Sequence, residues 1–194
     1  MLLRVKCLSI LTSVAMEPFD KKTLRRAVRA RIAALDADEK ASRSAVIAAK
    51  VEELLLACGA RVVALFSSLP DEPQLWPLVE RLAVGARVVL PRVEGDVMNF
   101  YDYAPAAMAI GSFCINEPQG VVPVEPCVID AMVVPGVVFS KNGARMGRGK
   151  GYYDKYMSRP GFAARKIGVC YEVQIVPHLP TEEHDVPMDA VVCG

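Results

Sequence analysis

Hydrophobic positions along the chain change between helical and extended spacing. From Asp20, a suitable N-cap, apolar residues recur every three or four positions up to Leu35 and predict an amphipathic helix. A second helix is expected from about Asp38 to Cys58, with Gly59 as its end. Two further helices are expected, near 75–83 and 152–158. Short apolar runs typical of strands occupy 61–67, 87–90, 98–103, 131–134, 166–171 and 190–193.

The alternation of strands with helices indicates a largely parallel sheet. The strands also consist mainly of uninterrupted apolar residues. Such strands are buried on both faces, as in α/β proteins with a largely parallel sheet covered by helices. Ligands of these sheets bind beyond the carboxyl ends of the strands. The polar loops after the strands at 61–67 and 131–134 both lie at such ends. We therefore expect them to form one shared cleft.

Composition fits a single compact domain. The chain has 194 residues, 53% of them hydrophobic, which is enough for a sizeable core. A net charge of +1 provides no overall field that would recruit nucleic acid or a membrane surface. The six cysteines are scattered without a C-x-x-C pair, which speaks against a disulfide framework or a zinc site. We expect reduced thiols, most of them in the core.

The N-terminal segment allows two interpretations. An apolar run at 8–15 follows Arg4 and Lys6, as in a signal or transit segment, although it is too short to span a membrane. Alternatively, Met16 opens the functional protein and the preceding codons are an extension. We favour the second interpretation, with an extension at 1–16 and one domain at 17–194. The expected location is cytoplasmic, or organellar if residues 1–15 act as a targeting segment.

The stretch at 139–154, FSKNGARMGRGKGYYD, combines the components of a phosphate site. Its glycines allow backbone N–H groups to approach a ligand, and its cations can neutralise phosphate oxygens. The glycines are Gly143, Gly147, Gly149 and Gly151, and the cations are Arg145, Arg148 and Lys150. Tyr152, Tyr153 and the metal-capable carboxylate of Asp154 follow. The spacing fits neither a Walker loop nor a dinucleotide fingerprint. A flexible, solvated basic loop is the simpler alternative.

This stretch resembles the signature of the 5-formyltetrahydrofolate cyclo-ligase (5,10-methenyltetrahydrofolate synthetase) family, approximately P-G-x-x-F-D-x-x-G-x-R-L-G-x-G-x-G-Y-Y-D. Pro135-Gly136 and Phe139 match its beginning, and the residues from Gly143 to Asp154 match the remainder. Two departures are Ser140, where the family has Asp, and Met146, where it has Leu. Met for Leu conserves volume, whereas Ser140 removes a negative charge near the loop.

Shorter motifs extend the resemblance over most of the chain. Residues 21–25 are similar to the N-terminal K-x-x-L-R of the family, and 69–72 to its acidic folate-binding loop. Residues 115–118, INEP, match another marker, with Asn116 where the family has Pro. The segment 179–189 is close to L-P-x-E-x-H-D-x-P-x-D. Pro73-Gln74-Leu75 departs from the usual acidic residue and Thr.

The resemblance implies a three-layer α/β/α sandwich and an ATP- and magnesium-dependent enzyme. The reaction would cyclise 5-formyltetrahydrofolate to 5,10-methenyltetrahydrofolate through phosphoryl activation of the formyl oxygen, with release of ADP and phosphate. The implied catalytic residues are Arg145, Arg148, Lys150 and Tyr153. The implied ATP-binding residues are Lys21, Lys22, Thr23, Leu24, Arg25, Arg145, Met146, Gly147, Arg148, Gly149, Lys150, Gly151, Tyr152 and Tyr153. The implied folate-binding residues are Ser67, Glu72, Arg148, Gly149, Lys150, Gly151 and Tyr152, and the implied magnesium ligands are Asp154 and Asp189.

Each of these residues also has a purely structural interpretation. Lys21 and Arg25 could form a solvated helix face, Glu72 a turn, and Asp189 a strand cap. Tyr152 and Tyr153 could be core aromatics.

Two other functions stay open at the sequence level. One is a different phosphate-handling enzyme on a similar scaffold, such as a kinase or a sugar-phosphate isomerase. The other is a nucleic-acid-binding module built on 21–31 and the basic loop, against which the near-neutral charge speaks. The expected partners are the folate substrate and ATP, without nucleic acid or membrane, for a monomeric protein.

Overall fold

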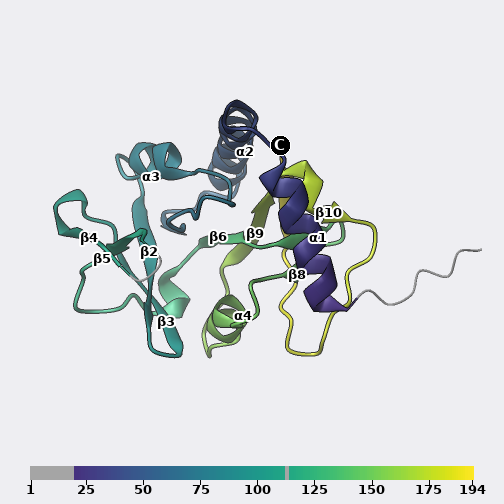
Figure 1. The fold of residues 1–194 in the computed structure, drawn as a ribbon. Helices are drawn as coiled ribbons and strands as arrows, with labels where there is room; N and C mark the ends of the chain where they lie inside the picture. Colours follow the sequence, from purple (N-terminus) through teal and green to yellow (C-terminus); the bar gives the residue numbers. More distant parts are fainter. Residues whose placement is uncertain (1–19, 112–113) are drawn as a thin grey trace, which may run out of the picture.

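A six-stranded sheet runs through the centre of the protein (Figure 1). The computed structural model describes residues 20–111 and 114–194, so the predictions for the extension at 1–16 lie outside the described residues. The strand order in the sheet is β11-β9-β6-β1-β2-β3. The bounds are β1 (Val62–Ala64), β2 (Arg87–Glu94), β3 (Val97–Asp102), β6 (Ala131–Pro135), β9 (Arg165–Cys170) and β11 (Ala190–Cys193). Every neighbouring pair is parallel except β2 and β3, which form an antiparallel hairpin at one edge.

Helices cover both faces of this sheet. The long helices α1 (Lys21–Ala33) and α2 (Ala37–Ala57) and the shorter α3 (Trp76–Leu82) pack on one face, and α4 (Tyr152–Met157) packs on the other. Alternate strand residues separate the two cores: Val63 of β1 joins the side of α1–α3, and Ala64 joins the side of α4. This arrangement confirms the predicted α/β/α sandwich with its largely parallel central sheet.

The predicted helices begin and end close to their expected residues. Asp36 caps α2, and its Oδ1 accepts a hydrogen bond of 2.8 Å from the backbone N–H of Glu39. Asp20 stands at the N-cap of α1, yet its side chain makes no capping hydrogen bond. None of the helices among the described residues is long and apolar enough to cross a membrane.

Several short strands and turns were not predicted from the sequence. β4 (Met108–Ile110) pairs with β5 (Asn116–Pro118), and β7 (Val138–Ser140) pairs with β8 (Arg145–Met146) and with β10 (Ile175–Val176). Three 3-10 turns complete the described chain, η1 (Pro105–Ala107), η2 (Pro126–Val128) and η3 (Glu172–Gln174). Strands of two or three residues have too few positions for a recognisable hydrophobic period, so tertiary contacts define them.

The cysteines differ from their predicted environment. Cys170 is buried, Cys193 is half-buried, and Cys58, Cys114 and Cys127 are exposed. These five are free thiols, so the absence of a disulfide framework holds for the described residues. The expectation that most of the thiols lie in the core was wrong, because exposed helix-end and loop positions hold three of them.

Candidate active site

The glycine-rich stretch folds into a hairpin followed by a loop. β7 and β8 pair in register, and the residues 147–151 (the glycine loop) then lead into α4. Gly149 and Gly151 have φ values of 102° and 68°, which favour glycine. Gly143, at φ 93° in the hairpin turn, could not carry a Cβ, which would lie 2.4 Å from the carbonyl oxygen of Met188. The hairpin turn is therefore packed tightly against the C-terminal segment.

A cavity of about 280 Å³ (the loop cavity) opens beside the glycine loop. Its walls come from the loop, the start of α1 and the C-terminal segment. Its cationic lining residues are Lys21, Arg25, Arg145, Arg148 and Lys150, and its acidic ones are Glu72, Asp154, Glu182 and Asp185. The remaining lining residues include Met146, Gly147, Gly149, Gly151, Tyr152, Tyr153 and His184. Five cations around one cavity of this size suit a polyphosphate.

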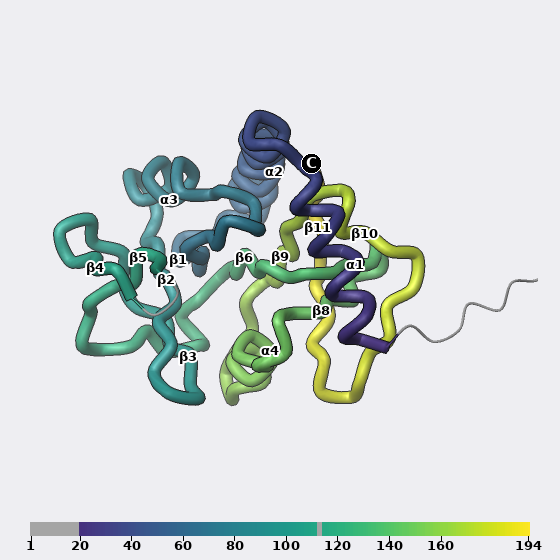
Figure 2. Tube along the Cα trace, viewed as in Figure 1, coloured from purple at the N-terminus to yellow at the C-terminus, as the bar shows by residue number. Residues whose placement is uncertain are grey.

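Helix α1 is anchored to this cavity at two points. Arg25 Nε donates a 2.8 Å hydrogen bond to the carbonyl oxygen of Gly147 in the glycine loop. Lys21 Nζ lies 2.8 Å from Glu182 Oε1 and 3.1 Å from Asp185 Oδ2 in the C-terminal segment, which runs beside α1 (Figure 2). Burial lowers the pKa of Lys21, but the two carboxylates outweigh it, so the net shift is upward.

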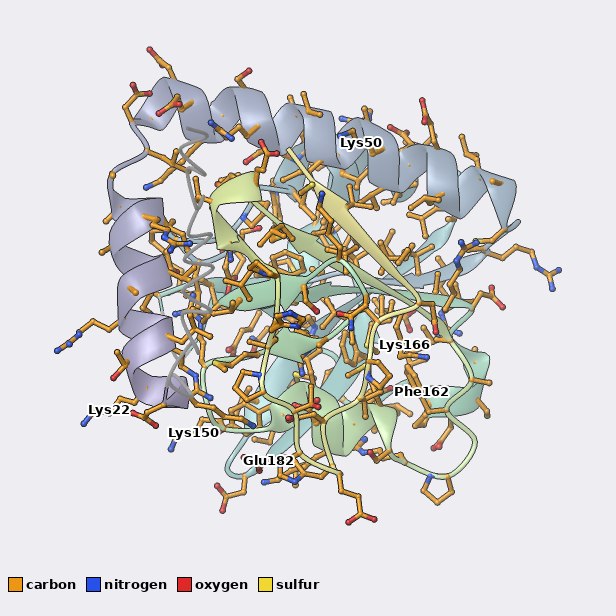
Figure 3. The ribbon with its side chains drawn as sticks, turned by 90° about the vertical axis from the view of Figure 1, so that its right-hand side faces the viewer. Lys22, Lys50, Lys150, Phe162, Lys166 and Glu182 are labelled. Atoms are coloured by element: carbon orange, nitrogen blue, oxygen red, sulfur yellow. The ribbon has the colours of Figure 1, made fainter. Side chains whose placement is uncertain are left out.

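The other three residues of the predicted N-terminal set do not line either cavity described here. Lys22 is exposed and extends from the edge of the molecule (Figure 3). Leu24 packs against the core, and Thr23 is half-buried outside both cavities. Helical geometry explains why only Lys21 and Arg25 of this set line the loop cavity, because they lie one turn apart on the same face.

Arg145 and Asp154 form a buried ion pair at the base of the loop cavity. Arg145 Nη2 lies 2.8 Å from both carboxylate oxygens of Asp154, and the Arg145 side chain is only 3% exposed. The backbone N–H of Val186 also donates to Asp154, at 3.2 Å. Asp154 thus connects the arginine, its own helix α4 and the C-terminal segment.

Asp189 does not line this cavity. Its Oδ2 accepts a 2.7 Å hydrogen bond from the backbone N–H of Lys166 at the start of β9, and its Oδ1 pairs with Lys166 Nζ at 3.0 Å. Figure 3 shows Lys166 well apart from Lys150 of the glycine loop. The contacts with Lys166 agree with the interpretation of Asp189 as a strand cap. Within 20–111 and 114–194, no three His, Cys, Asp or Glu side chains form a group that could hold a metal ion.

A second cavity of about 670 Å³ (the apolar cavity) lies at the carboxyl ends of β1, β2 and β6. Its walls are mainly apolar, with Phe66, Leu69, Pro91, Val93, Met98 and Ile115. Ser67 lines it and donates a 2.5 Å hydrogen bond to the carbonyl oxygen of Asn116, which holds β5 at its edge. Two carboxylates in its wall, Glu72 and Glu117, are each 6% exposed. A flat ligand with N–H donors would suit this lining.

The two cavities share one wall. Glu72, Pro135, Arg148, Lys150, Tyr152 and Tyr153 line both of them. Arg148 donates from Nε and Nη2 to Glu72 Oε1, at 3.2 and 3.0 Å, and from Nη2 to Asp71. Glu72 Oε2 accepts a further hydrogen bond of 3.0 Å from the backbone N–H of Leu69. Burial raises the pKa of Glu72 in spite of these donors.

The two tyrosines of the shared wall are held differently. Tyr152 donates a 3.3 Å hydrogen bond to the carbonyl oxygen of Gly95 in the β2–β3 turn. The ring of Tyr153 lies 5.7 Å from the Arg145 guanidinium carbon, and burial strongly raises the pKa of its phenol. The phenol of Tyr153 can donate or accept a hydrogen bond in either cavity.

Ser140, the departure from the signature, lies inside the hairpin rather than in either cavity. Its hydroxyl contacts Asn142, and its backbone N–H donates to the carbonyl oxygen of Ala144 at 3.0 Å. Neither bond connects Ser140 to a cation of the glycine loop.

Sequence reasoning missed several lining residues. Asp71, Glu117, Glu182, His184 and Asp185 all line one of the cavities. All five lie within or beside the short motifs that carry the family resemblance, which was the available signal. The apolar walls had no such signal, because a core residue and a cavity-lining residue look alike in sequence.

The sequence model of the 5-formyltetrahydrofolate cyclo-ligase family matches residues 18–194. A 5-formyltetrahydrofolate cyclo-ligase of Saccharomyces cerevisiae is 31% identical over 201 residues, which cover 90% of this chain and 95% of the yeast protein. One of Escherichia coli K12 is 33% identical over 144 residues, covering 69% of this chain and 78% of that protein.

A solved structure shares the fold as well. The 5,10-methenyltetrahydrofolate synthetase of Aquifex aeolicus superposes with a TM-score of 0.80 at 33% sequence identity, covering 89% of each chain.

Proposed function

The chain belongs to the 5-formyltetrahydrofolate cyclo-ligase family, and we propose that it is the enzyme that cyclises 5-formyltetrahydrofolate to 5,10-methenyltetrahydrofolate with ATP and magnesium. The observation that carries this proposal is the shared wall. A basic cavity suited to a polyphosphate meets an apolar cavity suited to a flat ligand, and Arg148, Lys150 and Tyr153 lie between them.

The chemistry needs such an arrangement. A formyl group on nitrogen is a poor electrophile, and its oxygen leaves badly as hydroxide. Transfer of the γ-phosphoryl group of ATP to the formyl oxygen breaks the bond to ADP and makes that oxygen part of a phosphate leaving group. N10 of the folate then attacks the formyl carbon and loses its proton, and phosphate departs with the former formyl oxygen. The protein mainly positions the two substrates and balances charge during phosphoryl transfer.

In this proposal, the cations of the loop cavity hold the nucleotide. Lys21 and Arg25 of α1 and Arg145 of β8 all line this cavity and would supply positive charge to the polyphosphate. Arg148 and Lys150, which line both cavities, stabilise the phosphoryl group as it passes to the formyl oxygen. No side chain needs to act as a nucleophile.

The apolar cavity receives the folate. Glu72 accepts N–H donors of the pterin, and its surroundings exclude water from the reacting groups. Ser67 holds the edge strand β5 through Asn116, so that it shapes this cavity as well as lining it.

Magnesium fits this site through a single protein carboxylate. Asp154 lines the loop cavity, and magnesium commonly takes one or two carboxylate oxygens and completes its octahedron with phosphate and water. When bound with the nucleotide, the ion would neutralise charge on the polyphosphate. Both carboxylates already have partners, Asp154 in Arg145 and the Val186 N–H and Asp189 in Lys166. Asp154 is preferred because it lines the loop cavity, and a contribution of Asp189 stays a prediction.

The test is an absorbance assay for methenyl-folate formation from 5-formyltetrahydrofolate. Product should appear only when ATP and magnesium are both present, together with an equal amount of ADP. ATP hydrolysis that does not depend on folate would instead indicate another phosphate-handling enzyme. We further expect the purified protein to be a monomer in light scattering and cytoplasmic in a full-length fluorescent fusion.

A further inference from the structure

Arg148 lines both cavities, and its guanidinium is paired with two carboxylates of the shared wall. It donates to Glu72 twice and to Asp71 once. Glu72 has its second oxygen engaged by the Leu69 N–H. Both oxygens of Glu72 therefore accept hydrogen bonds.

Substrate binding requires a rearrangement of these contacts. Glu72 accepts three hydrogen bonds and has about four acceptor positions, so a pair of pterin N–H groups would displace one of the present bonds. The bonds to the mobile Arg148 side chain are the ones that can be released, since the third comes from the backbone of Leu69. The guanidinium would then lose a partner inside a cavity wall, where an unpaired charge is costly. A second carboxylate that keeps its hydrogen bond to Arg148 avoids the cost of leaving the guanidinium unpaired.

Asp71 is placed to be that acceptor. It lines the apolar cavity but not the loop cavity, and its side chain is 35% exposed, so it can hold Arg148 from the solvent side. The backbone that carries both acids is fixed. Tyr171 Oη donates to the carbonyl oxygen of Glu72 at 3.0 Å, and Ser68 Oγ donates to that of Pro73 at 2.7 Å.

We propose that Asp71 is a positioning residue that keeps Arg148 paired at the shared wall while Glu72 turns to the folate. This inference rests on the proposed function, because it takes 5-formyltetrahydrofolate as the ligand of Glu72. It goes beyond that proposal in assigning a role to a residue that does not itself contact the reacting groups.

The test is a double-mutant cycle on folate binding, measured by titration calorimetry with 5-formyltetrahydrofolate and no ATP. Asp71→Asn leaves Glu72 as the only anionic partner of Arg148 and should raise the Kd about three- to tenfold. Asp71→Ser should do the same. In an Arg148→Met background, Asp71→Asn should have no further effect, because the interaction that it alters is already absent. Equal effects of Asp71→Asn with and without Arg148 would overturn the inference.

The pH dependence of the same Kd tests whether the charge of Asp71 acts at the shared wall. Burial raises the pKa of Glu72, and the negative charge of Asp71 adds to this rise. Asp71→Asn should therefore shift the acid limb of folate binding to lower pH, and an unshifted limb would count against the inference. Asp102→Asn is the matched control, because it removes one charge from an exposed Arg–Asp pair with Arg87 outside both cavities. This control should change neither the Kd nor its pH limb.

Failure of the inference and failure of the proposed function give different results. A wild-type protein that binds 5-formyltetrahydrofolate without forming the methenyl product refutes the proposed function, while the binding cycle still decides the role of Asp71. A wild-type protein that does not bind this folate refutes both.

Discussion

Replacing Asp154 by Asn tests whether the Arg145–Asp154 pair holds the glycine loop in place. The substitution preserves shape and one carbonyl acceptor, but it removes the charge that both 2.8 Å contacts to Arg145 Nη2 depend on. The Arg145 side chain is 3% exposed and the Asp154 side chain 15% exposed, so water in the loop cavity can replace the lost partner only in part.

The expected cost follows from this burial. Removing one partner of a buried ion pair typically destabilises a protein by about 3–5 kcal/mol. Because Asn keeps one acceptor, we expect the free energy of unfolding to fall by about 2–3 kcal/mol. With a urea m-value of roughly 2 kcal/mol/M, the unfolding midpoint should fall by about 1–1.5 M at an unchanged m-value.

Urea titration followed by circular dichroism measures this shift, and Asp102→Asn provides the comparison. Its pair with Arg87 has contacts of 2.6 and 2.9 Å, but both side chains are about half exposed. Its loss should cost about 0–1 kcal/mol. If Asp154→Asn costs no more than Asp102→Asn, the Arg145–Asp154 pair does not anchor the loop, and the structural reasoning about Asp154 fails.

Other predictions concern activity. Arg25→Ala should raise the KM for ATP about tenfold or more because it removes a cation from the loop cavity, whereas Lys22→Ala on the same helix should leave it unchanged. Because burial raises the pKa of Glu72, kcat/KM for the folate should fall on acidification through that raised pKa, and Glu72→Gln should abolish this limb and raise the folate KM more than the ATP KM. In a magnesium titration of activity, Asp154→Asn should raise the magnesium requirement, and an equal rise for Asp189→Asn would show that the ion reaches both carboxylates.

The sequence predicted the fold because most of its strands and helices carry strong local signals. The helix α2, which ends just before Gly59, has the spacing of an amphipathic helix, and the short apolar run at 131–134 is bounded by Pro135-Gly136, which favours a strand. Their alternation then limits the topology to a parallel sheet covered on both faces. The glycine-rich basic stretch predicted a phosphate site, because glycines with cations between them are typical of anion-binding loops.

Only the tertiary structure decided which of these residues share a surface. Lys21 and Lys22 are neighbours in sequence, yet only Lys21 lines the loop cavity. Asp154 and Asp189 belong to similar motif contexts, but Asp154 faces the cavity and Asp189 caps a strand through Lys166. The pairing of Arg148 with Asp71 and Glu72 joins loops 76 and more residues apart. The sequence did predict that these two loops share one cleft, because both follow strands of a parallel sheet. Which side chains pair across the cleft depends on how all the elements pack, and the sequence of neither loop contains that information.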